Sequence, residues 1–181
     1  MFLKIKPIIG DRKEFLIKRY CRGRVLNVGC GEVHIPGAVN LDRNAQCNPD
    51  IASDFHKMPF EDNEFDVAYA FDVIEHTEQP KALVEEMQRV VKSDGRVVVA
   101  CNDFDIQPQN WNANPEHATY FNEKIFREFF EPKGFSVFSL YRGVLVATNK
   151  PKKLNKLFSV LFAIYKRPFN FLKKLIKSNN I

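Results

Sequence analysis

The sequence lacks the features that mark a membrane-spanning, secreted or disulfide-rich protein. Its longest apolar run, near residues 157–165, is far shorter than the ~20 residues of a transmembrane helix. The N-terminus has neither the apolar region nor the cleavage site of a secretory signal. The four cysteines, Cys21, Cys30, Cys47 and Cys101, fit no zinc-binding spacing and no disulfide framework. We therefore expect a cytoplasmic protein.

The overall composition is that of an ordinary globular protein. Hydrophobic residues make up 45% and charged residues 27% of the 181 residues. These values exclude a disordered or collagen-like chain. The length suffices for one hydrophobic core, so we expect one domain or one domain with an appendage.

Acidic residues are absent from one end of the sequence. Residues 150–181 contain nine Lys or Arg and no Asp or Glu, and residues 1–24 carry a net charge of +6. The middle of the sequence, residues 25–149, carries a net charge of −10. Nucleic-acid-binding domains usually carry basic patches on the body itself, so we do not expect a nucleic-acid partner. The charge pattern instead favours contact of the two ends with something anionic.

The basic C-terminal tail also has apolar residues at helical spacing. Between residues 154 and 176 large apolar side chains recur on one helix face, with lysines beside them. Such a segment can lie peripherally in a membrane interface. Packing against its own domain or a dimer partner is the alternative. We accordingly predict an N-terminal helix at residues 1–23, a domain at 24–149 and a basic amphipathic tail at 150–181.

The middle of the sequence alternates between strand-like and helix-like segments. Alternation of this kind predicts an α/β fold: a Rossmann-like, doubly wound, mostly parallel sheet with a C-terminal antiparallel hairpin. The expected strands are at residues 24–28, 38–42, 50–53, 65–71, 96–101, 135–141 and 144–149, and the expected helices are at residues 11–21, 80–93 and 122–131.

Polar and glycine residues follow each expected parallel strand. Ligands of such sheets bind at the carboxyl ends of the strands, so these residues are the candidates for a site. A glycine turn at 29–31 lets a backbone approach a ligand closely. Asp42 is placed to accept hydrogen bonds from two ribose hydroxyls, and Asp54 with Phe55 suits an adenine. Each acid alone is equally compatible with a surface or turn-capping role.

These residues resemble the class I S-adenosylmethionine-dependent methyltransferases of the broad type 11 group. The resemblance rests on LNVGCG, NLD, SDFHKMPFEDNEFDVAYAFDVIEH, LVEEMQRVVKSDGRVVVA and KIFREFFEPKGFSV, in that order, and covers roughly residues 24–149. It implies S-adenosylmethionine as cofactor. It further implies that the glycine turn holds the methionine part, Asp42 the ribose, and Asp54 with Phe55 the adenine. The implied cofactor-binding set is Asn27, Val28, Gly29, Cys30, Gly31, Asp42, Asp54, Phe55 and Asp72.

Two departures from the family pattern lie near the glycine turn. Asn27 stands where the family usually has an acid, so that position carries no charge. Only a few residues separate Gly31 from the strand that begins at Ala38, whereas a usual crossover helix needs about a dozen residues or more. We therefore expect the first crossover helix to be reduced to a turn, as in a subgroup that this sequence resembles.

All four histidines fall in segments expected at the carboxyl edge of the sheet. His76 follows Glu75, which can orient it as a general base, and His117 lies in the long loop where this family builds its substrate pocket. We assign His76 and His117 as catalytic residues. A metal site of Glu75, His76 and His117 ranks below acid–base use because its spacing is not diagnostic. Trp111 and Tyr120, in the same loop, are candidate acceptor contacts.

The sequence therefore predicts a methyltransferase that acts on a small-molecule, glycan or lipid-linked acceptor. A catalytically inactive adaptor at a membrane or partner protein is the main alternative, favoured by the two departures. A nicotinamide-dependent oxidoreductase is disfavoured, because its third fingerprint glycine would be needed where His34 stands.

Overall fold

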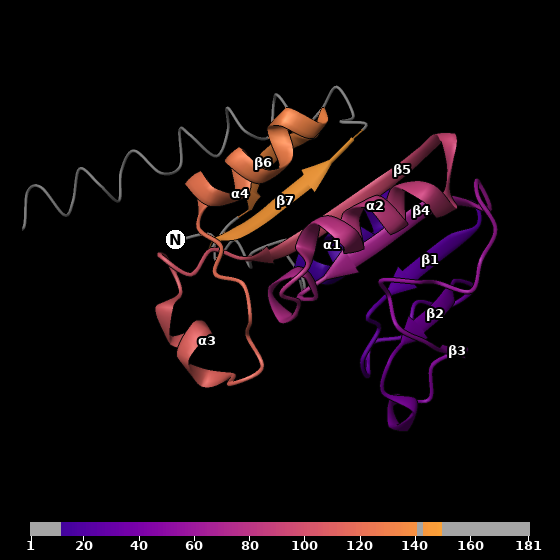
Figure 1. The fold of residues 1–181 in the computed structure, drawn as a ribbon, viewed down its shortest axis with the longest axis horizontal. Coiled ribbons are helices and arrows are strands. Elements are labelled where there is room, and N and C mark those ends of the chain that lie inside the picture. Colours follow the sequence, from indigo (N-terminus) through magenta and orange to yellow (C-terminus); the bar gives the residue numbers. More distant parts are fainter. Residues whose placement is uncertain (1–11, 141–142, 150–181) are drawn as a thin grey trace, which may run out of the picture.

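The computed structural model describes residues 12–140 and 143–149. Its centre is a seven-stranded sheet with the strand order β3-β2-β1-β4-β5-β7-β6 (Figure 1). All neighbouring strands from β3 to β5 are parallel, whereas β7 runs antiparallel to both β5 and β6. The predicted fold class is thus confirmed, including the C-terminal hairpin. The strands are β1 (Val25–Val28), β2 (Val39–Asp42), β3 (Ile51–Ala52), β4 (Phe65–Phe71), β5 (Val91–Asn102), β6 (Ser136–Leu140) and β7 (Val144–Thr148).

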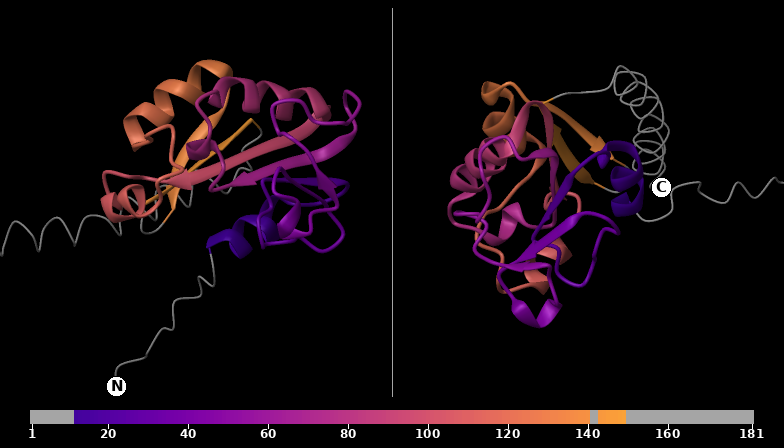
Figure 2. Two further views of the ribbon diagram at one scale, coloured as in Figure 1. Left: turned by 60° about the horizontal axis from the view of Figure 1, so that its bottom comes forward. Right: turned by 90° about the vertical axis from the view of Figure 1, so that its right-hand side faces the viewer.

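Helices cover both faces of the sheet, but unequally. Helices α2 (Pro80–Val90) and α4 (Glu123–Phe130) lie on one face, and α1 (Arg12–Tyr20) lies on the other (Figure 2). A short helix, α3 (Pro108–Ala113), lies beyond the end of the sheet (Figure 1). Three single turns, η1 (Ala45–Cys47), η2 (Ile74–His76) and η3 (Glu131–Lys133), complete the described helical segments.

The larger core fills the space between the sheet and helices α2 and α4. Leu83, Val84, Met87 and Val90 of α2 are buried there, together with Phe126 and Phe130 of α4. On the opposite face, Leu16 and Tyr20 of α1 pack against Val67 and Tyr69 of β4. Because β4 is buried on both faces, its sequence FDVAYAF is almost continuously apolar, as expected for a central parallel strand.

No helix joins β1 to β2 in the described part of the chain, as the sequence predicted. Side-chain hydrogen bonds hold this contracted crossover instead. The buried Asn27 amide donates to the Val33 carbonyl at 2.9 Å and to Asn40 Oδ1 at 3.0 Å. The same Asn40 oxygen accepts the Ile35 amide at 2.8 Å. A carboxylate at position 27 has no proton to donate to Val33, which explains why an amide stands there.

The structure differs from the prediction at the start of β5. Helix α2 ends at Val90 and the strand begins at Val91, where Asp94 and Gly95 had been expected to end the helix. Val91 pairs with Phe65 before the register shifts toward Arg96. Gly95 lies in this irregular stretch, and a Cβ there would lie 2.9 Å from the backbone oxygen of Asp66. The glycine thus permits a close strand approach rather than ending a helix.

Some predictions concern residues outside the described part of the chain. These are the amphipathic tail at 150–181, the beginning of the N-terminal helix, and Arg142 of the hairpin turn. The domain boundaries at residues 24 and 149 stay predictions. Among the described residues, no helix combines the length and apolarity needed to cross a bilayer.

Candidate cofactor and acceptor site

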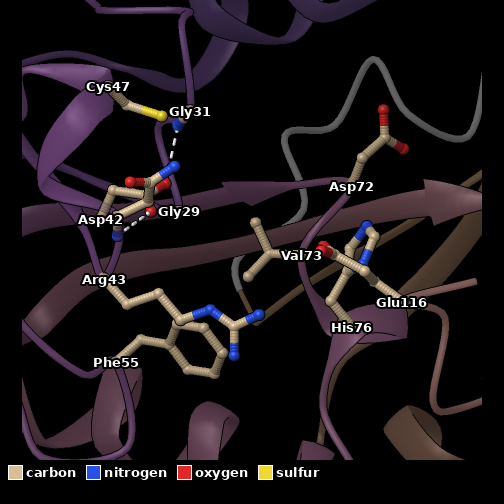
Figure 3. A pocket seen from close by; sticks show the side chains of 11 residues that line it. Gly29, Gly31, Asp42, Arg43, Cys47, Phe55, Asp72, Val73, His76 and Glu116 are labelled. Carbon is tan, nitrogen blue, oxygen red and sulfur yellow. Dashed lines mark hydrogen bonds between the residues drawn. The ribbon is translucent and has the colours of Figure 1, made fainter. Parts of the chain in front are cut away.

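One cavity of about 470 Å³ opens at the carboxyl end of the parallel strands. This is the edge at which sheets of this type bind ligands, and the volume lies in the usual range for small-molecule sites. Loops after β1, β2 and β3 form one side, and the loops after β4 and β5 form the other (Figure 3). The lining residues are Gly29, Gly31, Asp42, Arg43, Asn44, Cys47, Phe55, Asp72, Val73, His76 and Glu116.

The two glycines of the turn after β1 are required for different reasons. Both have positive φ angles, +62° at Gly29 and +50° at Gly31, which residues with a side chain rarely adopt. A Cβ at Gly29 would lie 2.5 Å from a methyl group of Val73, so that glycine allows the turn to pack against the loop after β4. A Cβ at Gly31 would meet nothing within 4 Å, so it would project into open space at the cavity.

Asp42 is fixed in position by backbone amides at the end of β2. One carboxylate oxygen accepts from Gly31 N and the other from Asn44 N, each at 2.8 Å. Each oxygen of an ionised carboxylate can accept two hydrogen bonds, so both keep acceptor capacity. The side chain is half-buried and lines the cavity. Two vicinal hydroxyls of a ribose fit this arrangement.

Asp54 and Phe55 point in different directions. Phe55 is 6% exposed and lines the cavity. Asp54 is not among the lining residues: its carboxylate accepts from the backbone amide of His56 and contacts that imidazole at 2.9 Å. These hydrogen bonds lower the pKa of Asp54. The geometry is that of a turn cap, while the predicted adenine contact of Asp54 stays a prediction.

Asn27, Val28 and Cys30 lie beside the cavity rather than in its lining. Asn27 holds the contracted crossover, and Val28 is buried in the larger core. The Cys30 side chain is also buried, and burial together with the nearby Asp42 charge raises the pKa of its thiol to about 11. The thiol is therefore protonated near neutral pH, which fits a packing role.

Asp72 occupies a backbone conformation that is uncommon for a residue with a side chain. Its φ is +55°, and its carboxylate accepts a hydrogen bond from the Asn102 amide at 3.1 Å. Strain of this kind persists where the surrounding structure holds it in place, often at functional sites. Asp72 lines the cavity opposite Asp42 (Figure 3).

Glu75, His76 and His117 come together next to the cavity. The His76 and His117 rings lie 4.7 Å apart between centroids. Glu75 is fully buried, and neither of its carboxylate oxygens has a hydrogen-bond partner in the described part of the chain. Burial and the charge of Asp72 raise the pKa of Glu75 to about 8. Burial and the neighbouring His117 lower the pKa of His76, which favours its neutral form.

Backbone hydrogen bonds bring the loop after β5 to the loop after β4. The amides of Ala118 and Thr119 both donate to the Glu75 carbonyl, at 2.7 and 3.0 Å. The Thr119 hydroxyl donates to the Thr77 carbonyl at 2.6 Å. These contacts place His117 beside His76, although the two residues are far apart in the sequence.

The aromatic residues of the loop after β5 pack around one buried ring. Phe104 is 0% exposed, and Trp111, His117 and Tyr120 lie with their centroids 5.1 to 5.5 Å from it. Trp111 and His117 are stacked with an interplanar angle of 18°. The Tyr120 hydroxyl donates to Asp105 at 2.7 Å. The predicted acceptor contacts thus form one cluster, and none of them is among the residues that line the cavity.

Sequence analysis did not predict five of the residues that line the cavity. They are Arg43, Asn44, Cys47, Val73 and Glu116. Arg43 immediately follows Asp42 at the end of β2, and its guanidinium extends toward Val73 and Phe55 (Figure 3). The position of Arg43 directly after a strand could have marked it as a candidate site residue. Glu116 precedes His117 and is brought to the cavity only by the tertiary contacts of that loop.

Comparison with known proteins shows which domains this chain is similar to. Residues 33–99 match the family model described as a methyltransferase domain. The fold matches a solved protein of Bacillus halodurans, described as a candidate methyltransferase, with a TM-score of 0.60 and 20% identity over 72% of this chain and 71% of that chain. The match over residues 33–99 and the shared fold make this part of the chain similar to methyltransferase domains.

Two further similarities involve a solved structure and a curated protein. A solved complex named DhpI-SAM-HEP has a TM-score of 0.57 and 17% identity, and the match covers 77% of this chain and 83% of that one. A sterol 4-C-methyltransferase of Caenorhabditis elegans is 35% identical over 74 residues, which are 39% of this chain and 22% of that protein. The chain spans only 22% to 51% of the length of the first curated relatives that it matches.

Proposed function

We propose that this protein is an S-adenosylmethionine-dependent methyltransferase. The observation that carries the proposal is the cavity at the carboxyl edge, where a glycine turn, a fixed carboxylate and a buried aromatic ring converge. The methyltransferase domain match supports it, as does the solved complex with SAM in its name. The antiparallel β7 between β5 and β6 further disfavours a dinucleotide-binding oxidoreductase, whose classic strand order is 3-2-1-4-5-6.

The residues of the cavity fit the cofactor. The open space over Gly31 admits a ligand close to the backbone, Asp42 has acceptor capacity for the ribose, and Phe55 offers an apolar face for the adenine. Asp42 and Asp72 lie on opposite sides of the cavity, and their carboxylates favour a cationic ligand. When bound, S-adenosylmethionine supplies a methyl group that is already activated on a sulfonium sulfur.

His76 and His117 are proposed to act on the acceptor. His76 lines the cavity, and its lowered pKa keeps the imidazole neutral and able to accept a proton from a hydroxyl. His117 stacks on Trp111 within the aromatic cluster. Trp111 and Tyr120 stay proposed acceptor contacts.

A small molecule or a glycan is the acceptor class that we propose. The loop at residues 103–120 is rich in polar side chains, and it borders the cavity through Glu116. The nematode relative is named for a sterol, but the match covers 39% of this chain, so we do not transfer its acceptor. A lipid-linked sugar approached through the basic tail remains part of the proposal.

Calorimetric titration with S-adenosylhomocysteine tests the cofactor site. We expect micromolar binding that is lost in Asp42→Ala and weakened at least tenfold in Gly31→Ala, whose new methyl group occupies ligand space. Glu61→Ala, at an exposed position away from the cavity, is the matched control and should bind like the wild type. Absence of binding at millimolar ligand in the wild type contradicts the proposal and favours the adaptor alternative.

A further inference from the structure

We propose that Glu75, His76 and His117 together hold a divalent transition-metal ion at the acceptor side of the cavity. This inference rests on the proposed function for its role, but the metal site itself stands on the geometry of three side chains. One potential ligand atom of each residue lies within 4.8 Å of those of the other two. A carboxylate oxygen and two imidazole nitrogens form a donor set typical of catalytic zinc sites and of other transition-metal sites with open positions.

The strongest support comes from the Glu75 carboxylate. It is 0% exposed, and both oxygens lack a hydrogen-bond partner among the described residues. Buried polar atoms without a hydrogen-bond partner are uncommon in native proteins, and an ion that binds them is one physical explanation. Among the described residues Glu75 forms no salt bridge, although the charge of Lys13 acts on it electrostatically. A cation between Glu75 and the two imidazoles would bind these carboxylate oxygens.

Both imidazoles are oriented as metal ligands usually are. A metal-binding histidine commonly donates its other ring N–H to a carbonyl or carboxylate. Nδ1 of His117 lies 3.2 Å from the Trp111 carbonyl, and a hydrogen bond links His76 to the Glu116 backbone. The backbone thus engages one nitrogen of the His117 ring, which leaves Nε2 as its potential ligand atom.

The spacing requires only a small closure around an ion. Bonds of 2.0–2.2 Å at tetrahedral angles place ligand atoms about 3.4 Å apart around a bound zinc ion. The three ligand atoms lie within 4.8 Å of one another, so they need to approach by at most about 1.5 Å. The backbone is already held, because the Ala118 and Thr119 amides both donate to the Glu75 carbonyl.

The position of the site indicates what the ion would do. His76 lines the cavity, whereas Glu75 and His117 are not among the lining residues, so an ion held by all three would reach the acceptor at His76. An acceptor hydroxyl bound there would become more acidic and release its proton to solvent water. With the ion bound, the two histidines would act on the acceptor through it, and the direct proton uptake proposed for His76 would not be needed. The acceptor class is then an alcohol or phenol oxygen.

The test is a metal titration of the full chain after dialysis against EDTA. We expect one Mn²⁺ per chain by electron paramagnetic resonance, and one Zn²⁺ of at least micromolar affinity by calorimetry. Glu75→Gln and His117→Gln should each weaken binding of both ions at least tenfold. His34→Gln, which removes an exposed histidine bonded to the Cys47 carbonyl, should leave Mn²⁺ binding unchanged.

S-adenosylhomocysteine binding separates this inference from the proposed function. Glu75 and His117 do not line the cavity, so both variants should bind the nucleoside as the wild type does, which also shows that they fold. If the wild type binds the metal but not S-adenosylhomocysteine, the metal site is supported and the proposed function is refuted. Nucleoside binding without metal binding, or metal binding that both variants retain, would overturn the inference.

Discussion

The two sides of the cavity are held by different kinds of interaction. The side after β1 and β2, which we term the polar wall, is built on Asn27, Asn40 and Asp50. The side after β5, which we term the aromatic wall, is built on Phe104 with Trp111, His117 and Tyr120 around it. The polar wall occupies the position of the usual crossover helix. Side-chain hydrogen bonds fix the connection between β1 and β2 there, whereas helix packing fixes such connections elsewhere in the sheet. A short connection can therefore still present a glycine turn and an aspartate.

The largest effect on stability should come from the aromatic wall. Phe104→Ala removes a fully buried ring and the contacts of three neighbouring rings. We expect the free energy of unfolding to fall by about 3–5 kcal/mol, as for other buried Phe-to-Ala changes. Urea denaturation measures it, with Phe104→Leu as a control of smaller effect. A loss below about 1 kcal/mol would mean that this wall is not tightly packed.

The substitution Asn27→Asp, in the polar wall, should lower the stability by less than Phe104→Ala but by a measurable amount. Asn27→Asp replaces an amide that donates to Val33 and Asn40 with a buried carboxylate that has no proton for either. An unsatisfied buried polar group costs about 1–3 kcal/mol. Thermal or urea denaturation checks this against Asn112→Asp, the same change at an exposed position. Equal stability of the two variants would show that the Asn27 hydrogen bonds do not hold the crossover.

The smallest effect should be a pH-dependent one at Asp50. The backbone and side-chain amides of Asn40 both donate to this carboxylate, at 2.8 and 2.9 Å, and they lower its pKa. An acid with a lowered pKa in the folded state contributes stability above its ordinary pKa of 3.8, and that stability is lost as the pH falls through the folded value. The Tm difference between wild type and Asp50→Ala should therefore shrink below pH 3.8. A difference that is unchanged down to pH 2 would contradict this role.

Sequence reasoning reached further for the fold than for the site. The alternation of strands and helices and the loss of the first crossover helix were both predicted, because they depend on local sequence patterns and on the length of the connection. Asp54 and Phe55 show the limit. They are neighbours in the sequence, yet one caps a turn and the other lines the cavity, and that division depends on local backbone geometry.

Long-range contacts account for the remaining differences. Glu116 and His117 reach the cavity side by side with His76 only because the loop after β5 is bonded to the Glu75 carbonyl. The missing partner of the Glu75 carboxylate could not be inferred either, since burial of one acid is a property of the whole packing.

The paired amides on that carbonyl have a consequence for local opening. If the hydrogen bonds from Ala118 and Thr119 to the Glu75 carbonyl break, the loop that carries His117 is released from the loop after β4. The loops after β4 and β5 should therefore open as one cooperative unit. The amide protons of Ala118 and Thr119 then report on both loops in hydrogen exchange. A ligand that immobilises His76 should slow their exchange even if it touches neither residue.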